Sequence, residues 1–226
     1  MSSLFISRLK EECPWMSQFP EHTFVAQRLI RFERVTQDQP PPKTEWIFFS
    51  SPRSVEFFLP FTTFNEHTPH FAAMGAGTSK AIHDLGFATA FTGTSSDPQI
   101  VAEEFKQLLR PATHVLFPIA EESRRSIIQS AKGLNSIPWI CYRTVEVPDT
   151  IPPCDTLIFS SPSNVRSFFA MNTPLATQNI ISFGPSTGSE VNKLLLATGS
   201  SVRKHMVLDR VTDERIASAI AEMHSQ

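Results

Sequence analysis

The chain has 226 residues, of which 41% are hydrophobic and 19% are charged, and its net charge is −2. This length predicts one large domain or two domains of about 100–130 residues, and the near-neutral charge argues against a general nucleic-acid-binding protein. No apolar run approaches the ~18 residues of a membrane-spanning helix, and three cysteines without paired spacing (Cys13, Cys141 and Cys154) argue against a disulfide framework or a structural zinc site and favour a reducing, cytoplasmic location.

Short apolar segments recur along the chain with helical patterns between them. The segments expected as strands are 4–7, 24–30, 46–50, 70–74, 88–92, 113–118, 137–142, 155–160, 179–183 and 201–206. The helical patterns are clearest at 100–109, 124–132 and 213–224, after Pro162 and in the stretch that ends at Leu196. Alternation of strand and helix predicts parallel sheets with helices on both faces.

Two proline-containing stretches, 37–42 and 147–154, interrupt this alternation. Such runs resist helix and central strand, so they suit linkers. The strand count between them is five, whereas the segment after the second stretch supplies only three. The first 33 residues can supply the missing two. We therefore expect a discontinuous α/β domain (1–33 and 155–226), an inserted α/β domain (44–142) and linkers at 34–43 and 143–154.

An internal repeat supports this plan. Phe49-Ser-Ser-Pro-Arg-Ser-Val55 matches Phe159-Ser-Ser-Pro-Ser-Asn-Val165 with an offset of 161 − 51 = 110. Downstream, Met74-Gly-Ala-Gly-Thr78 matches Phe183-Gly-Pro-Ser-Thr187 with an offset of 187 − 78 = 109. Convergent turn chemistry is the alternative, but two collinear matches favour duplication.

Each repeat places hydroxyl groups at the start of a helix. Ser51 and Ser161 fit the N-cap position, followed by proline at the first helical position. Thr78 and the pair Ser186 and Thr187 follow a glycine-containing turn and precede a helix. Helix starts present unpaired N–H groups that bind anions, and in open α/β sheets ligands bind beyond the carboxyl ends of the strands. A single helix start of this kind is best explained as an ordinary cap, worth about 1 kcal/mol, whereas four in duplicated pairs favour an anion site in a cleft between the domains.

Other motifs are less informative. Gly75-Ala-Gly-Thr-Ser-Lys80 lacks both the third glycine of a dinucleotide fingerprint and the Walker spacing. Arg53 directly follows a Ser-Pro helix start and could pair with an anion there. The histidines have no metal-binding spacing. Tyr142, the only tyrosine, ends the last strand of the inserted domain, where it is either a site residue or a packing residue.

These motifs together resemble the uroporphyrinogen-III synthase family. The resemblance rests on the two Phe-Ser-Ser-Pro repeats, the two glycine turns and Tyr142-Arg-Thr144, in this order and spacing. It implies two flavodoxin-like parallel-sheet α/β domains joined by a two-stranded linker. It also implies an enzyme, a hydro-lyase of heme and porphyrin biosynthesis, that cyclises hydroxymethylbilane to uroporphyrinogen III with inversion of ring D and loss of water and uses no metal or organic cofactor.

The resemblance also implies roles for individual residues. Tyr142 matches the family tyrosine regarded as a proton donor to the departing hydroxyl. Residues expected to bind the eight carboxylates of the tetrapyrrole are Ser51, Arg53, Thr78, Arg124, Ser161, Ser163, Ser186 and Thr187. The loop Ile119-Ala-Glu-Glu-Ser-Arg124 departs from the family pattern because it lacks an arginine and a glycine.

A second interpretation is a non-catalytic two-domain binder of anionic small molecules, which needs the helix-start hydroxyls but not Tyr142. A third is a relative with the same fold and different chemistry, which fold alone does not exclude. We further expect a monomer that binds a small-molecule tetrapyrrole, and neither nucleic acid nor membrane.

Overall fold

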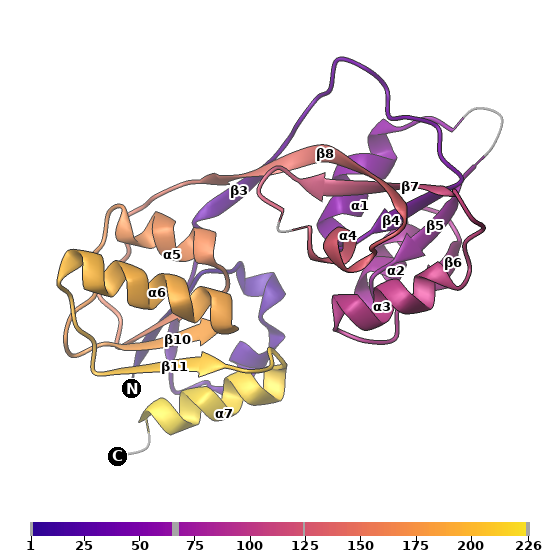
Figure 1. Ribbon diagram of the computed structural model, residues 1–226. Helices are drawn as coiled ribbons and strands as arrows, with labels where there is room; N and C mark the ends of the chain where they lie inside the picture. Colours follow the sequence, from indigo (N-terminus) through magenta and orange to yellow (C-terminus); the bar gives the residue numbers. More distant parts are fainter. Residues whose placement is uncertain (1, 65–67, 124, 225–226) are drawn as a thin grey trace. The chain divides into compact units, whose positions relative to one another are not determined.

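The structure, a computed structural model, describes residues 2–64, 68–123 and 125–224. It divides into two compact units, unit 1 (residues 1–31 and 145–226) and unit 2 (residues 32–144). Each unit has its own β-sheet flanked by helices (Figure 1). In the described part of the chain no helix is long and apolar enough to span a membrane.

Unit 1 contains five parallel strands in the order β11-β10-β9-β1-β2. In chain order they are β1 (Ser3–Ile6), β2 (Thr23–Ala26), β9 (Thr156–Phe159), β10 (Asn179–Phe183) and β11 (Lys204–Leu208). Two short 3₁₀ helices, η1 (Lys10–Glu12) and η2 (Pro14–Gln18), lead from β1 to β2, and the α-helices are α5 (Pro162–Phe169), α6 (Pro185–Thr198) and α7 (Asp213–His224). Numbered along the unit, the strand order is 2-1-3-4-5, as in flavodoxin.

Unit 2 contains five parallel strands in the order β8-β7-β4-β5-β6. They are β4 (Trp46–Phe49), β5 (His70–Ala73), β6 (Thr89–Thr92), β7 (His114–Ala120) and β8 (Asn135–Glu146). The helices are α1 (Pro52–Phe58), η3 (Leu59–Phe61), α2 (Ala76–Asp84), α3 (Pro98–Lys106) and α4 (Ser126–Ser130).

The two chain crossings between the units are strands. β3 (Ile30–Arg34) lies beside β8 at the edge of the unit 2 sheet. Val35 N–H donates to the Cys141 carbonyl, and Val147 N–H donates to the Leu29 carbonyl. From one hydrogen bond to the other the residue number rises along β3 and falls along β8, so the two strands are antiparallel. The expected fold class, two parallel-sheet α/β units with a two-stranded connection, is confirmed.

Apolar side chains pack on both faces of each sheet. In β1, Leu4 and Ile6 join the cluster beneath α7, whereas Phe5 joins the cluster beneath α5 and α6. Unit 2 has the same arrangement, with α1 and α2 on one face and α3 and α4 on the other. Side chains alternate between faces along a strand, so a strand covered on both sides is apolar throughout.

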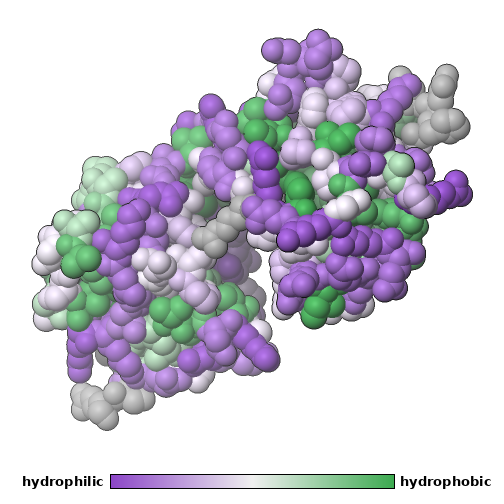
Figure 2. All heavy atoms as spheres, in the orientation of Figure 1, coloured by the Kyte–Doolittle hydropathy of each residue, from purple (hydrophilic) through white to green (hydrophobic). Residues whose placement is uncertain are grey.

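The surface carries scattered apolar side chains without a dominant patch on the face shown in Figure 2, where hydrophilic residues cover much of each unit. Exposed examples on unit 1 are Met171, Leu175 and Leu196. Isolated exposed apolar residues of this kind are ordinary in folded proteins.

The expected elements are present, with shifts at their ends. The ranges 179–183 and 213–224 match β10 and α7. The expected strand 24–30 is two strands, β2 and β3, and the expected helix 124–132 is shortened to α4. The first difference arises because β3, with its charged residues Arg31, Glu33 and Arg34, lacks a buried apolar run and owes its conformation to pairing with β8.

The two units share one plan. β9 and β4 are the central strands, and each leads directly into a Ser-Ser-Pro helix start. The next strand and helix in each unit, β10–α6 and β5–α2, follow in the same place. Read in the same direction across the sheet, the strands of unit 1 follow the order 2-1-3-4-5, and those of unit 2, numbered along unit 2, follow the order 5-4-1-2-3. The positions in the sheet correspond, and only the order in which the chain visits them differs. This correspondence supports the duplication inferred from the sequence.

Candidate functional site

The Ser-Ser-Pro motifs form helix caps, as expected. The Ser51 hydroxyl accepts a hydrogen bond from Ser54 N–H (3.2 Å), and the Ser161 hydroxyl accepts one from Asn164 N–H (3.3 Å). Both serines have extended backbone conformations, and proline occupies the first helical position in α1 and α5. The two caps stand at the carboxyl ends of their parallel sheets, where α/β folds bind ligands.

The threonines of the second repeated motif lie inside helices. The N-cap residues are Gly75 for α2 and Gly184 for α6, so Thr78 and Thr187 fall in the first helical turn. Both threonines are buried, whereas Ser186 is half-buried. Of these three hydroxyls, the one on Ser186 is the most accessible to a ligand.

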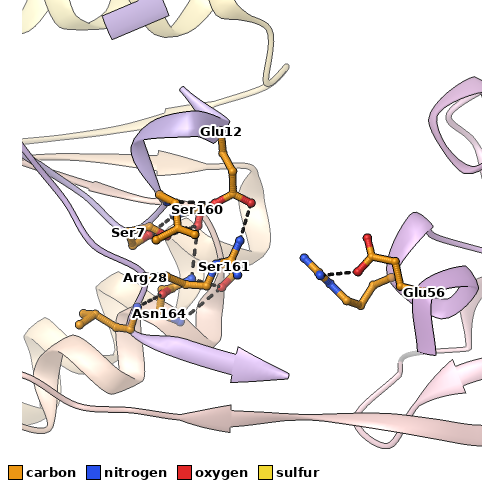
Figure 3. A network of polar contacts seen from close by, with 10 residues as sticks. Ser7, Glu12, Arg28, Glu56, Ser160, Ser161 and Asn164 are labelled. Carbon is orange, nitrogen blue, oxygen red and sulfur yellow. Dashed lines mark hydrogen bonds and ion pairs between the residues drawn. The ribbon is translucent and has the colours of Figure 1, made fainter. Parts of the chain in front are cut away.

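Unit 1 carries a polar network at its cap (Figure 3). Ser160 N–H donates to the Ser7 hydroxyl (2.8 Å), and Ser160 Oγ donates to the Ser7 carbonyl (3.0 Å). Asn164 Nδ2 donates to Ser161 Oγ (2.9 Å), and Asn164 Oδ1 accepts from Leu29 N–H (3.0 Å). The network therefore joins the ends of β1 and β9 to the segment that follows β2.

An ion pair lies beside this network. The Arg28 guanidinium contacts the Glu12 carboxylate, and Leu9 N–H donates to the other oxygen of that carboxylate (3.0 Å). Partial burial opposes ionisation of Glu12, but the Leu9 N–H and the charges of Arg28 and Arg8 outweigh it, so the pKa of Glu12 is lowered. The Arg8 guanidinium lies 5.0 Å from the centre of the Phe183 ring, next to the turn that begins α6.

Sequence reasoning had not singled out Glu12, Arg28 or Asn164. Glu12 and Arg28 are 16 residues apart, and Asn164 is 135 residues from the Leu29 N–H that it binds. No local spacing marks such pairs. The one available signal was that Asn164 lies within the repeated motif, at the position where the other copy has Ser54.

Ser163, the residue after Pro162, accepts a hydrogen bond from the Arg166 guanidinium (3.3 Å). Arg166 also contacts the Glu146 carboxylate (2.6 Å). Ser163 is thus part of a surface ion-pair group in unit 1, on the first turn of α5.

Unit 2 presents an aromatic environment at its cap. Tyr142 is 9% exposed and packs against Phe57, with ring centres 5.4 Å apart, and against Phe32, with ring centres 6.0 Å apart. Burial raises the pKa of Tyr142, while the nearby Ser51 hydroxyl and the charge of Arg53 oppose the rise. The phenol is therefore neutral near pH 7.

Arg53 lies at the same helix start. Its guanidinium stacks 4.2 Å from the centre of the Phe32 ring and contacts the Glu56 carboxylate at 2.6 Å. The fold of unit 2 thus brings together Ser51, Arg53 and Tyr142, three of the expected site residues.

Arg124 lies outside the described residues. In the altered loop before it, the Glu122 carboxylate accepts from Thr144 N–H at 3.3 Å.

A Ser–His–Asn chain of hydrogen bonds occurs elsewhere in unit 1. Ser182 Oγ lies 2.9 Å from His205 Nε2, and His205 Nδ1 lies 2.9 Å from Asn192 Oδ1. Because the asparagine oxygen can only accept, Nδ1 carries the proton and Nε2 accepts from the serine. Ser182 is fully buried within β10, so it is a structural group and not a nucleophile that a substrate could reach.

Two further features bear on ligand chemistry. Within the described ranges, no group of three or more histidine, cysteine or acidic side chains could hold a metal ion. Unit 2 also contains a cavity of about 1090 Å³, whose walls include Glu45, His70 and His114 from the beginnings of strands. These three wall residues lie at the amino-terminal ends of strands, whereas Ser51 and Gly75 follow the carboxyl ends.

Comparison with known proteins identifies the family. A family model described as "Uroporphyrinogen-III synthase HemD" matches residues 14–200. Among solved structures, the uroporphyrinogen-III synthetase of Helicobacter pylori has a TM-score of 0.67 at 16% identity, over 99% of this chain and 100% of that one. A mutant uroporphyrinogen III synthase of the extremely thermophilic bacterium Thermus thermophilus has a TM-score of 0.56 at 11% identity, over 100% of both chains. No curated protein sequence matches this chain significantly.

Proposed function

Because the chain belongs to the uroporphyrinogen-III synthase family, we propose that the helix starts described above bind the substrate of that family's reaction. The reaction closes hydroxymethylbilane to uroporphyrinogen III, inverts ring D and releases water. It is a cofactor-independent hydro-lyase step of heme biosynthesis. The observation that carries the proposal is the repeated placement of a Ser-Pro cap and a glycine turn at the carboxyl end of both sheets.

Carboxylate binding is the first task of such a site. The tetrapyrrole carries eight carboxylates, and helix starts bind anions through N–H groups and the helix dipole. Hydroxyl donors add further hydrogen bonds, and arginine adds charge-assisted ones. We propose substrate-binding roles for Ser51, Arg53, Thr78, Arg124, Ser161, Ser163, Ser186 and Thr187. The buried Thr78 and Thr187 would act mainly by holding the first turns of α2 and α6, with Ser186 as the more accessible donor.

Tyr142 is proposed as the catalytic residue. Loss of the hydroxyl breaks a carbon–oxygen bond, and the oxygen takes both electrons and needs a proton to leave as water. The neutral phenol of Tyr142, which lies near the Ser51 hydroxyl, can donate a hydrogen bond to the departing oxygen of the substrate. Since its pKa is raised, the phenol is a weak acid. The pyrrole nitrogen can push out the hydroxyl, so we expect positioning of the substrate to contribute more than proton transfer.

One assay tests the function. Hydroxymethylbilane cyclises spontaneously to uroporphyrinogen I, so the measured quantity is the excess of isomer III over isomer I after chromatographic separation. We expect isomer III to dominate with the intact protein and isomer I with heat-denatured protein. If only isomer I formed while the protein still bound uroporphyrin, the proposed enzymatic function would be wrong. The protein would then be a non-catalytic binder of anionic small molecules.

We also propose that the protein is a cytoplasmic monomer that does not bind nucleic acid. The three cysteines are free and buried, which suits a reducing compartment. The net charge of −2 gives no general attraction to nucleic acid. Multi-angle light scattering at several concentrations tests the monomer: a mass near 25.3 kDa is expected, and a doubled mass would contradict it.

A further inference from the structure

Unit 1 holds a carboxylate of its own at the place where substrate carboxylates are expected. The segment after β1 turns into η1, which directs Glu12 back toward the strand ends (Figure 3). One oxygen of Glu12 accepts from Leu9 N–H, and the other contacts Arg28. Arg8, at the end of β1, acts on the same carboxylate electrostatically.

The surrounding groups are those of an anion site. Leu29, next to Arg28, is anchored to Asn164, which also binds the Ser161 cap of α5. Arg8 stacks beside Phe183, directly before the turn of α6. The described part of unit 1 therefore brings two arginines and the start of the eight-residue helix α5 to the carboxyl end of the sheet, where Glu12 contacts one of the arginines, Arg28.

We propose that Glu12 is a specificity-determining residue that occupies the anion site of unit 1 and is exchanged for a substrate carboxylate. The proposal rests on the proposed function. On binding, Arg28 would release the Glu12 carboxylate and accept a carboxylate of the tetrapyrrole in its place. A neutral ligand could not replace Glu12 at the Arg28 guanidinium, so the exchange selects anionic ligands.

The exchange requires an ion pair that is easily opened. The side chains of Arg28 and Glu12 are 24% and 38% exposed, and ion pairs that reach solvent contribute little to stability. Glu12 also lies in a three-residue 3₁₀ helix with no buried residue. Glu12 can therefore move away from Arg28 without disturbing the core of unit 1.

The test uses the full-length protein and uroporphyrin, the fluorescent octacarboxylate, as the binding probe. Glu12→Gln keeps an oxygen that can accept from Leu9 N–H and removes the charge. We expect Glu12→Gln to lower the Kd for uroporphyrin, and the KM for hydroxymethylbilane, by about 3–10-fold with kcat nearly unchanged. Glu11→Gln, one residue earlier in η1, is the matched control and should change either value less than twofold.

A double substitution distinguishes exchange from general charge effects. If Glu12 competes for Arg28, then Glu12→Gln should give no gain in affinity in the Arg28→Gln background. An unchanged or weaker affinity of Glu12→Gln, an equal gain in Glu11→Gln, or a gain that persists without Arg28 would each overturn the proposal. Failure of the proposed function looks different, because the unsubstituted protein would then produce no excess of isomer III.

Discussion

The two helix caps are built on one plan but have different chemistry. In unit 1, Asn164 connects the Ser161 cap to Leu29, 135 residues away. In unit 2, Ser54 occupies the matching position, and its hydroxyl donates to the Ser51 carbonyl, three residues away (2.7 Å). Polar groups thus hold the cap of unit 1 in place, whereas aromatic rings, Phe57 and Tyr142, surround the cap of unit 2. The two caps share one backbone arrangement, and different side chains at a few positions make the surroundings of one cap polar and of the other aromatic.

The largest effect should come from removing the central asparagine of unit 1. Asn164→Ala leaves the Leu29 N–H without its acceptor and opens a small void. We expect it to lower the free energy of unfolding by about 3 kcal/mol, since one buried unsatisfied donor costs about 1–3 kcal/mol. Ser54→Ala, the matched change in unit 2, should cost about 1 kcal/mol.

Urea unfolding measures both changes, and hydrogen exchange by mass spectrometry shows which unit has been loosened. Faster exchange confined to unit 1 in Asn164→Ala is expected. Equal losses in the two variants would mean that the asparagine network contributes no more than a local cap, and the contrast between the units would disappear.

The glycine turns give the next effect. Gly184 has φ +81° and ψ 163°, whereas Gly75 has φ −170°. The first conformation is nearly restricted to glycine, while the second is extended backbone that any residue adopts. A Cβ at either position meets no atom within 4 Å, so backbone conformation alone should decide. We expect Gly184→Ala to cost about 2 kcal/mol and Gly75→Ala less than about 0.5 kcal/mol, measured as shifts in the urea midpoint.

Tyr142→Phe tests the aromatic edge of unit 2. A positioned proton donor contributes about 10²–10⁴-fold. We expect kcat to fall by less than about tenfold, or ~1.4 kcal/mol, with KM nearly unchanged, because the substrate can expel its own hydroxyl. Thr187→Ala, in unit 1, is compared in the same assay and should raise KM. A fall in kcat of several hundredfold for Tyr142→Phe would instead identify a true general acid, and full activity in both variants would remove both residues from the proposed site.

A smaller effect concerns pH and unit 1. Burial lowers the pKa of His205. A histidine with a lower pKa when folded binds more protons when unfolded, so its stabilisation is complete above the unfolded pKa of about 6.5 and is lost as the pH falls toward the folded pKa. We expect the urea midpoint to fall between pH 7.5 and pH 5.5, and to fall less in His205→Gln. Part of the pH dependence of the urea midpoint should remain in His205→Gln, since the pKa of His224 is also lowered. If the urea midpoint changed equally with pH in the unsubstituted protein and in His205→Gln, protonation of His205 would not destabilise the folded Ser182–His205–Asn192 chain.

Local chemistry allowed the caps to be predicted. Ser51 and Ser161 bind N–H groups three residues ahead, so a short motif contains both partners. The strands were visible because both faces of each sheet are covered, which makes central strands such as β9 and β10 apolar at most positions and buried at every one. This signal placed the strand 179–183 correctly, and the helical pattern of 213–224 placed α7 correctly.

The sequence alone therefore settled features whose partners are near in the chain or whose signal is burial: the parallel-sheet α/β class, the repeat and the serine caps. Features that join distant residues became visible only in three dimensions. β3 is a strand because β8 pairs with it, Asn164 is central because Leu29 lies against it, and Glu12 meets Arg28 because η1 folds back over the strand ends. The physical reason is that hydrogen bonds and ion pairs act over a few ångströms in space, and separation along the chain says nothing about that distance once the chain has folded.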